Sequence, residues 1–142
     1  MTTFTFKKKE RLKSRKVIER LFSDGQSFGA YPLRLVFLKM EEPAGDSPVQ
    51  FTVSVPKRNF KSAVARNRIK RKVREAWRLN KHWLYKKLSK RKVQYAFMVI
   101  YSGKEDLSYS EIERAMKNMN MRFVKKNIAS KTNPTQKKKP LS

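Results

Sequence analysis

The stretch Ser54–Glu75, SVPKRNFKSAVARNRIKRKVRE, decides the fold of this chain because two periodicities meet in it. Its first residues close the apolar run Val49–Val55, whose alternation predicts a strand, and Pro56 ends that strand because proline cannot donate to a sheet ladder. From about Ala63 the apolar residues recur at helical spacing, which predicts a helix to about Leu79 or a little beyond. The core stripe of this helix consists of Ala65, Ile69, Val73, Ala76 and Trp77.

The other side of this helix is strongly basic. Glu75 is the only acid between Lys57 and Lys81, so salt bridges between successive turns cannot neutralise the charge. Arginine outnumbers lysine from Arg66 to Arg78, and its planar guanidinium suits bidentate phosphate contacts. A solvated charged face is the ordinary alternative, but so much self-repulsion favours a polyanionic partner. The polar side consists of Arg66, Asn67, Arg68, Lys70, Arg71, Lys72, Arg74, Glu75 and Arg78.

The whole chain shares this charge balance: its 142 residues include 36 Lys and Arg against 11 Asp and Glu, a formal net charge of +25. The length favours one domain, and the 39% hydrophobic content suffices for one modest core. Such a charge attracts phosphate backbones or anionic membranes, but no apolar run approaches the length of a spanning helix. Residues 1–7 lack the apolar stretch of a signal peptide, and cysteine is absent, which excludes disulfides and thiolate metal sites. We therefore expect a cytoplasmic protein with no membrane partner.

The chain before the central stretch predicts a helix and two further strands. Apolar residues at i, i+1, i+4 and i+5 predict a helix from residue 13 or 14 to residue 23, and we expect Gly25 to end it in the left-handed conformation. Leu33–Lys39 is rich in branched and aromatic residues and predicts a strand, with a short strand near Ser27–Ala30. The Pro, Gly and Asp content of Glu41–Pro48 predicts a loop.

The chain after the central stretch predicts a loop, a strand and a last helix. Lys86–Lys92 is expected to be a charged loop, and the nearly continuous apolar run Gln94–Tyr101 predicts a central strand. Ser108 or Ser110 can cap the last helix, with Glu111 in its first turn. The apolar face of that helix consists of Ile112, Ala115, Met116, Met119 and Phe123.

These elements indicate an α+β sandwich, in which helices pack on a small sheet. The composition divides the chain into a basic arm over residues 1–9, a folded domain over 10–128 and a basic tail over 129–142. Because the tail consists of polar and basic residues that cannot form a core, we expect it to be disordered.

No constellation for protein catalysis or metal binding stands out in the sequence. His82 has no plausible ligand partners nearby, and a partly exposed histidine at a helix end is its ordinary interpretation. The acidic pairs Glu41-Glu42 and Glu105-Asp106 lie beside turn residues and lack the converging oxygen ligands of a metal site. Neither a dinucleotide-binding glycine loop nor a P-loop is present. We therefore expect no catalytic residue and no metal ligand in the polypeptide.

Aromatic residues lie among the lysines and arginines, a mixture that suits single-stranded nucleic acid. Stacking one base on an aromatic ring is worth about 1–3 kcal/mol. Taken singly, each of these aromatic residues is more often part of the core. They are Phe22, Tyr31, Phe37, Tyr95, Phe97 and Tyr101.

The run Ser54–Glu75 resembles the signature of the bacterial ribonuclease P protein subunit: a strand, paired basic residues, Ala-Val, and the Arg-Asn-Arg box at residues 66–68. The segment Lys9–Lys13, followed by Phe22 and Gly25, also matches this family, and the resemblance continues into the last helix. It implies a small αβββαβα sandwich of the α+β class. The expected fold has a left-handed βαβ crossover and is similar to the second domain of ribosomal protein S5.

The resemblance also implies a function as the protein subunit of ribonuclease P. In that family's endonuclease complex, the partner RNA is the catalyst that hydrolyses the precursor-tRNA backbone and leaves a mature 5′ end. Mg²⁺ is bound mainly by the RNA partner and the substrate. The protein binds the catalytic RNA, in an expected 1:1 complex, and also the 5′ leader of the precursor tRNA, and it assists metal binding.

The family's contact residues carry over to matching positions of this chain. A cleft for the leader lies between the first helix and the sheet, where Ile18 and Phe22 match the helix positions and Arg34 and Val36 the strand positions. The family often has aromatic residues where Ile18 and Val36 stand. Contacts to the catalytic RNA are implied for Lys57, Arg58, Arg66, Asn67, Arg68, Lys70, Arg71 and Arg74.

Two other functions compete with this interpretation. The composition alone fits a ribosomal or general RNA-binding protein equally well, and such a protein would bind with strong salt dependence and little preference among RNAs. DNA binding through a helix in the major groove is disfavoured, because the helix-turn-helix spacing is missing.

Overall fold

The computed structural model describes residues 10–40, 47–89 and 93–128, and these form one α+β unit of four strands and three helices. The basic arm, the expected 41–46 loop, residues 90–92 and the expected disordered tail lie outside the described residues. In chain order the elements are α1 (Arg15–Asp24), β1 (Gln26–Ala30), β2 (Leu33–Lys39), β3 (Val49–Ser54), α2 (Ala63–Leu88), β4 (Tyr95–Tyr101) and α3 (Tyr109–Asn127).

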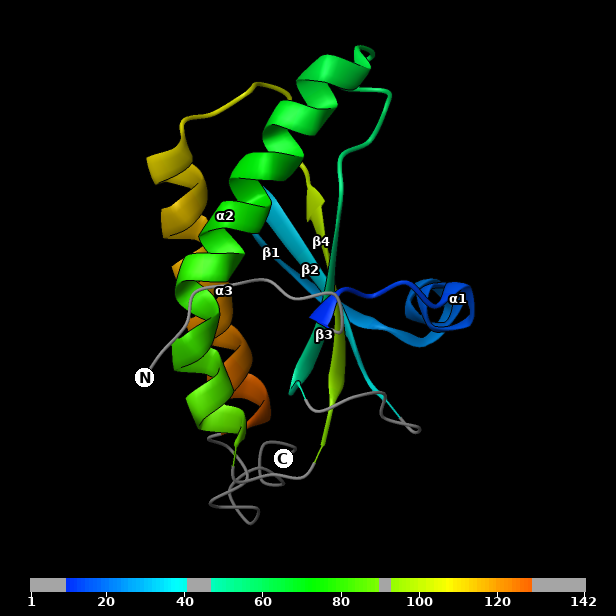
Figure 1. Ribbon diagram of the computed structural model, residues 1–142, viewed down its shortest axis with the longest axis vertical. Helices are drawn as coiled ribbons and strands as arrows, with labels where there is room; N and C mark the ends of the chain where they lie inside the picture. The colour runs from blue at the N-terminus through cyan, green and yellow to red at the C-terminus, as the bar shows by residue number, and fades with distance from the viewer. Residues whose placement is uncertain (1–9, 41–46, 90–92, 129–142) are drawn as a thin grey trace, which may run out of the picture.

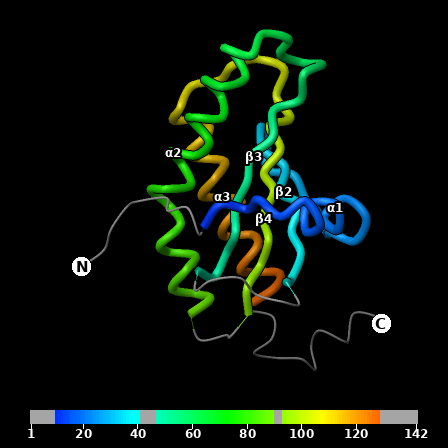
Figure 2. Tube along the Cα trace, turned by 45° about the vertical axis from the view of Figure 1, so that its right-hand side comes forward, coloured from blue at the N-terminus to red at the C-terminus, as the bar shows by residue number. Residues whose placement is uncertain are grey.

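The four strands form a single sheet in the order β1-β2-β4-β3, so the apolar strand β4 is central, as predicted. The pairs β1–β2 and β2–β4 are antiparallel, whereas β3 and β4 are parallel and are joined through α2. The handedness of the β3-α2-β4 unit can be followed in Figures 1 and 2. Seen from the α2 side with both strands pointing up, the chain passes from β3 through α2 to β4 on the left of β3. A step to the left in this view defines a left-handed crossover. Right-handed crossovers are the rule, so the expected left-handed crossover is a distinctive feature of the fold.

The two faces of the sheet are covered unequally. Helices α2 and α3 lie together on one face, and α1 alone lies on the other (Figure 1). On the two-helix side, Trp77 of α2 stacks on Phe51 of β3 with ring centroids 4.4 Å apart, and Phe97 of β4 packs edge-on against Phe123 of α3. All four side chains are at most 1% exposed and belong to one continuous core.

The α1 side has a much smaller core. Leu21 of α1 is buried there with Leu12, Met40 and two small or flexible residues of β4. Around this cluster, the side chains of α1 and β2 are only partly buried, including Ile18 and Val36. Much of this sheet face is therefore available to a ligand.

The end of α2 differs from the prediction, because the helix continues to Leu88 instead of stopping near Leu79. The expected loop over Lys86–Lys92 is therefore wrong for its first three residues, which belong to the helix. The core stripe runs on through Lys81, which is 2% exposed and forms a buried ion pair with Glu10. In a sequence, lysine is usually interpreted as a surface residue. Lys81 can lie in the buried stripe of α2 because the carboxylate of Glu10 pairs with its ammonium.

Gly25 ends α1 as predicted, but the reason is different from the predicted one. Its φ and ψ are −70° and 151°, an extended conformation that any residue can adopt. A methyl group at Gly25 would overlap the carbonyl oxygen of Leu21 and lie 2.9 Å from Cγ1 of Val36. This glycine is required because the chain passes close to β2 there, which sets how near α1 lies to the sheet.

The helix starts follow from serine caps. Ser62 accepts from the Ala65 amide at 3.2 Å and begins α2 at Ala63, as predicted. Ser108, one of the two predicted candidates, caps α3 and forms a capping box with Glu111. The predicted apolar face of α3, from Ile112 to Phe123, is buried against the sheet and α2.

Candidate nucleic-acid interface

The first half of α2 presents the basic face that the sequence predicts. Ile69 and Val73 are fully buried beneath it and fix its orientation on the sheet. Lys57 and Arg58 are exposed in the connector that leads from β3 to this helix. On the helix itself, the exposed or partly exposed predicted residues are Arg66, Asn67, Arg68, Lys70, Arg71 and Arg74.

Arg66 has a structural task in this face. Its Nη1 donates to the carbonyl oxygens of Phe60 at 2.7 Å and Lys61 at 2.9 Å. These bonds hold the connector against the first turn of α2. The guanidinium therefore helps to place Lys57 and Arg58 next to the helix.

Arg68 and Lys72 are held by an acid that is far away in sequence. Arg68 Nε donates to Asp106 at 3.0 Å, and Lys72 Nζ donates to the other carboxylate oxygen at 2.7 Å. Burial acts to raise the pKa of Asp106, but the bonds and charges of Lys72 and Arg68 outweigh it, and the pKa is lowered. Asp106 thus fixes the orientation of Arg68 and ties the segment before α3 to α2.

Other cations of the face are not neutralised within the described part of the chain. Lys70, Arg71 and Arg74 take part in none of its ion pairs, whereas Arg78 is bound by Glu75 through two hydrogen bonds. Lys70 and Arg71 are neighbours on one turn of α2, and Arg74 lies one turn further along. They form a ridge of positive charge with the geometry to follow a phosphate backbone.

The basic face continues around the edge strand β3, which the sequence did not indicate. The segment before α1 pairs with this edge, since the Leu12 amide donates to the Phe51 carbonyl at 2.9 Å. A cavity of about 160 Å³ lies there, lined by Arg11, Lys13 and Arg74 as well as by backbone and side chains of β3. Burial and the neighbouring charge of Arg11 both lower the pKa of Arg74.

Arg11 and Lys13 therefore extend the candidate interface beyond the residues that the sequence predicted. Both belong to the segment that carried the family resemblance, but no role was assigned to them. Their position depends on the pairing of residues 11 and 51, a contact that no local pattern predicts.

The predicted leader-binding residues come together on the opposite side of the sheet. Ile18 and Val36 pack at the rim of the small α1 core, and Arg34 lies on the same face of β2 as Val36. Arg34 is exposed and donates to Ser27 at 3.1 Å. Phe22, which is 70% exposed, adds an uncovered ring on α1.

The remaining aromatic residues divide between core and surface. Phe37, Phe97 and Tyr101 are buried in the core beneath α2 and α3, so the ordinary interpretation holds for them. Tyr95 is partly buried against the same core. Phe22 and Tyr31, both 70% exposed, are the two of this set that can stack on a base without repacking.

The candidate surface therefore has three parts, two of them basic and one largely apolar. The connector and α2 form the first part, the β3 edge with Arg11, Lys13 and Arg74 forms the second, and the sheet face on the α1 side forms the third. In Figure 2 the segment that leads into α1 passes beside β3. Within the described residues, no three His, Cys, Asp or Glu side chains converge on a metal-sized site. His82 is partly exposed, as predicted, but the predicted position at a helix end is wrong, because α2 continues past it to Leu88. No described helix is both long and apolar enough to cross a membrane.

Fold and surface together define a small α+β domain with a basic helix in a left-handed crossover. A family model described as Ribonuclease P matches residues 6–124. A protein named "Ribonuclease P protein component" from Porphyromonas gingivalis is 44% identical over 125 residues, covering 86% of this chain and 88% of that protein. A protein of the same name from Chlorobium phaeobacteroides is 37% identical over 83 residues, 57% of each chain. This chain belongs to the ribonuclease P protein family.

Solved structures of the same family share the fold. The RNase P protein from Thermotoga maritima superposes with a TM-score of 0.63 at 22% identity, covering 80% of this chain and 96% of that one. The Staphylococcus aureus RNase P protein gives a TM-score of 0.59 at 21% identity, covering 82% and 95%. The predicted α+β fold is therefore confirmed.

Proposed function

We propose that this chain is the protein subunit of a ribonuclease P, which binds a catalytic RNA and the 5′ leader of precursor tRNA in a 1:1 complex in the cytoplasm. The observation that carries the proposal is that Arg74 of the basic face of α2 meets Arg11 and Lys13, which lead into α1, at the β3 edge. A single RNA-bound particle could then hold its own RNA on one side and a substrate strand on the other. Family membership supports the same assignment.

The basic face of α2 is the proposed contact to the catalytic RNA. Lys70, Arg71 and Arg74 have no ion-pair partner among the described residues, and each would displace counterions from RNA phosphates. This release drives binding at low salt. Arg68 is held in place by Asp106 and needs no reorganisation to meet a phosphate through its remaining N–H groups. Asn67 is exposed between them and can bond to a sugar or a base edge.

The α1 side of the sheet is the proposed contact to the leader. Phe22 offers a ring for stacking, while Ile18 and Val36 form a flat apolar floor beside it. Arg34 supplies a positive charge for the leader backbone. Arg11 and Lys13 at the β3 edge would contact the leader where it runs from the α1 side towards α2. Because Ile18 and Val36 are aliphatic, most of the stacking falls to Phe22.

The proposal assigns the chemistry to the partner RNA. Mg²⁺, held by the RNA and the substrate, supplies the activation of water and the stabilisation of charge for phosphodiester hydrolysis. The side chains of this protein act by binding and orientation. By holding the leader beside the catalytic RNA, the cations of α2 and of the β3 edge reduce the repulsion between the two phosphate backbones.

Reconstitution with the cognate RNA tests this function. The full chain and the RNA are mixed at physiological Mg²⁺, and cleavage of precursor tRNA is followed by the appearance of a mature 5′ end. Stimulation by the protein, together with a particle mass of one protein per RNA, is the expected result. A general RNA-binding protein would instead bind many RNAs equally and leave the cleavage rate unchanged, and that outcome would refute the proposal.

A further inference from the structure

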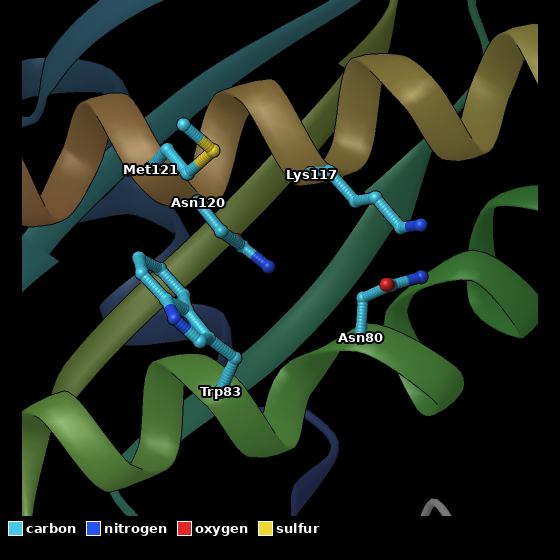
Figure 3. Close-up of a pocket in the computed structure, with 5 residues that line it drawn as sticks. All are labelled: Asn80, Trp83, Lys117, Asn120 and Met121. Atoms are coloured by element: carbon cyan, nitrogen blue, oxygen red, sulfur yellow. The ribbon is translucent and has the colours of Figure 1, made fainter.

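A groove between α2 and α3 lies outside the interface described above. It has a volume of about 490 Å³ and opens on the side of the two helices that faces away from the sheet (Figure 3). Its lining consists of Asn80, Trp83, Lys117, Asn120 and Met121. None of these residues belongs to the surface proposed for the catalytic RNA or for the leader.

Asn120 at the floor of this groove has an unsatisfied side chain. The residue is only 2% exposed, and within the described part of the chain neither Nδ2 nor Oδ1 has a hydrogen-bond partner. Figure 3 shows its amide directed into the space between Trp83 and Asn80. Burying an amide without partners is unfavourable, and a leucine would fill the position without that penalty. The amide is therefore placed for a ligand that offers one donor and one acceptor.

The walls of the groove suit a flat ligand with an anionic substituent. Trp83 is 43% exposed and presents its indole ring to the groove, opposite Met121. The ammonium of Lys87 lies 5.4 Å from the centroid of this ring, and Lys117 stands exposed at the rim. A cationic rim beside an aromatic wall favours a nucleotide over an uncharged aromatic molecule.

The polar floor also distinguishes this groove from a surface for protein docking. An apolar helix face that covers Trp83 and Met121 would leave the amide of Asn120 without a partner. A second copy would moreover bring together two chains that each carry a net charge of +25. A polyanion with flat polar bases satisfies both the charge and the amide.

We propose that the groove binds a nucleobase, with adenine preferred, extruded from a single-stranded segment of an RNA partner. One asparagine amide can bond to the amino group and the adjacent ring nitrogen of adenine. Trp83 then stacks on the base, and Lys87 and Lys117 bind the flanking phosphates. The inference rests on the proposed function only in that the partner is RNA, and it adds a second, base-selective contact on the far side of α2.

Tryptophan fluorescence of the full chain tests the groove directly. Trp77 is buried and stacked on Phe51, so quenching by a short single-stranded oligoadenylate reports on Trp83. The matched ligand replaces the adenines by purine bases that lack the 6-amino group, which keeps the stacking and removes one hydrogen-bond donor. The oligoadenylate should bind about five- to 150-fold more tightly, the discrimination of one bidentate amide–base pair. Equal binding of the two oligonucleotides, or no quenching, would overturn the proposal.

Asn120→Leu separates the ligand role from a structural role. It should abolish the preference for adenine and at the same time raise the melting temperature, because a buried unpaired amide is removed. A lower melting temperature with unchanged preference would mean that the amide serves the fold, and the proposal would be wrong.

The aromatic wall has its own pair of variants. Trp83→Ala should weaken the oligoadenylate, measured by calorimetry, whereas Trp83→Phe restores part of the affinity. Leu79→Ala, at an exposed apolar residue of α2 outside the groove, is the matched control and should leave binding unchanged.

Two further results keep this test independent of the proposed function. If the protein stimulates precursor-tRNA cleavage but shows no adenine preference, only the groove proposal fails. A dimer that dissociates on Trp83→Ala would assign the groove to a second copy, which also refutes the nucleobase proposal.

Discussion

The two faces of the sheet perform different tasks. Beneath α2 and α3 the core is continuous and aromatic, with Phe51, Trp77 and Phe97 packed ring against ring. Beneath α1 the buried cluster is small, and Ile18 and Val36 at its rim remain partly exposed. The same four strands supply both faces, since alternate residues point to opposite sides.

The difference shows how a small basic protein can keep a rigid fold and an open binding face. The free energy of folding comes mainly from the α2 and α3 side, where most of the apolar area is buried. The α1 side can therefore leave apolar and aromatic groups uncovered for a ligand without loss of the fold. The segment from Glu10 to Lys13 crosses the β3 edge and joins the two sides.

The largest effect is expected where this joining segment is anchored. Lys81→Ala would leave the Glu10 carboxylate buried without the Lys81 ammonium, while Tyr85, at 3.0 Å, would still donate to it. We expect a loss of about 3–5 kcal/mol in the free energy of unfolding, measured by urea denaturation.

The control for this anchor is Lys86→Ala, an exposed lysine of the same helix, which should change stability by less than about 0.5 kcal/mol. Replacing Glu10 and Lys81 together by Met should recover most of the loss, because two apolar groups replace the pair. Equal stability of Lys81→Ala and Lys86→Ala would show that the anchor does not hold the two faces together.

The same lysine shows why the sequence predicted one part of α2 and not the other. The strand Leu33–Lys39, the central β4 and the start of α2 follow from local periodicity and capping, and all were predicted within a residue or two. The last turns of α2 depend on a lysine that is buried only because Glu10 lies against it. A single-residue pattern cannot contain a partner that is 71 positions away.

The candidate site divides in the same way. The basic face of α2 is a helical pattern, so its residues could be predicted from spacing and charge. Arg11 and Lys13 reach the interface only through strand pairing at residue 51, and Asp106 reaches Arg68 only because α3 packs beside α2. Contacts between distant segments of the chain therefore account for what the sequence did not show.

The second prediction concerns the distance between α1 and the sheet, which keeps the α1 face open. Gly25→Ala places a methyl group against the Leu21 carbonyl and Val36, and forcing such a contact costs about 1–3 kcal/mol. The variant should lose stability by this amount and also bind the leader less well, because α1 must move away from β2. Thermal unfolding and leader-dependent tRNA binding measure the two effects.

Gly29→Ala is the matched control for this spacing. A methyl group there would meet only the Arg34 guanidinium at 3.4 Å, an ordinary contact. Its stability should lie within about 1 kcal/mol of the unmodified chain. If Gly25→Ala were as stable as Gly29→Ala, the close approach of α1 to β2 would not matter for the fold.

Phe22 tests the open face itself. Phe22→Ala should weaken binding of leader-containing precursor tRNA by about 1–3 kcal/mol, the value of one stacked base, and leave mature tRNA unaffected. Stability should hardly change, because the ring is 70% exposed. Tyr31→Ala removes an equally exposed ring at the other end of β1 and should have no such effect. A similar loss for both variants, or for both tRNAs, would contradict the cleft assignment.

On the α2 side the expected effect is smaller and depends on salt. Arg71→Ala should lower the affinity for the catalytic RNA and reduce the slope of log affinity against log salt by about 0.7–0.9, as for one lost phosphate contact. Lys125→Ala removes the same charge from the last turn of α3, far from this face, and should leave the slope unchanged (Figure 1). Filter binding at several salt concentrations measures both, and identical slopes would point to non-specific attraction by net charge alone.

The smallest effect concerns the tie between α3 and the basic face. The pKa of Asp106 is lowered in the fold because Lys72 and Arg68 outweigh burial, so its ion pairs stabilise the protein above the ordinary carboxyl pKa of 3.8. The stabilisation by these ion pairs is lost as the pH falls through the lowered pKa of Asp106, because the carboxylate then becomes protonated in the folded protein as well. Since the carboxylate is 29% exposed, solvent screening limits the stabilisation by these ion pairs to less than about 1 kcal/mol.

Asp106→Asn should therefore unfold more easily than the unmodified chain at pH 6, and the difference in the free energy of unfolding should shrink towards pH 2.5 in urea titrations. Lys72→Met should flatten the same pH dependence, and a difference that stays constant down to pH 2.5 would show that the tie is not ionic.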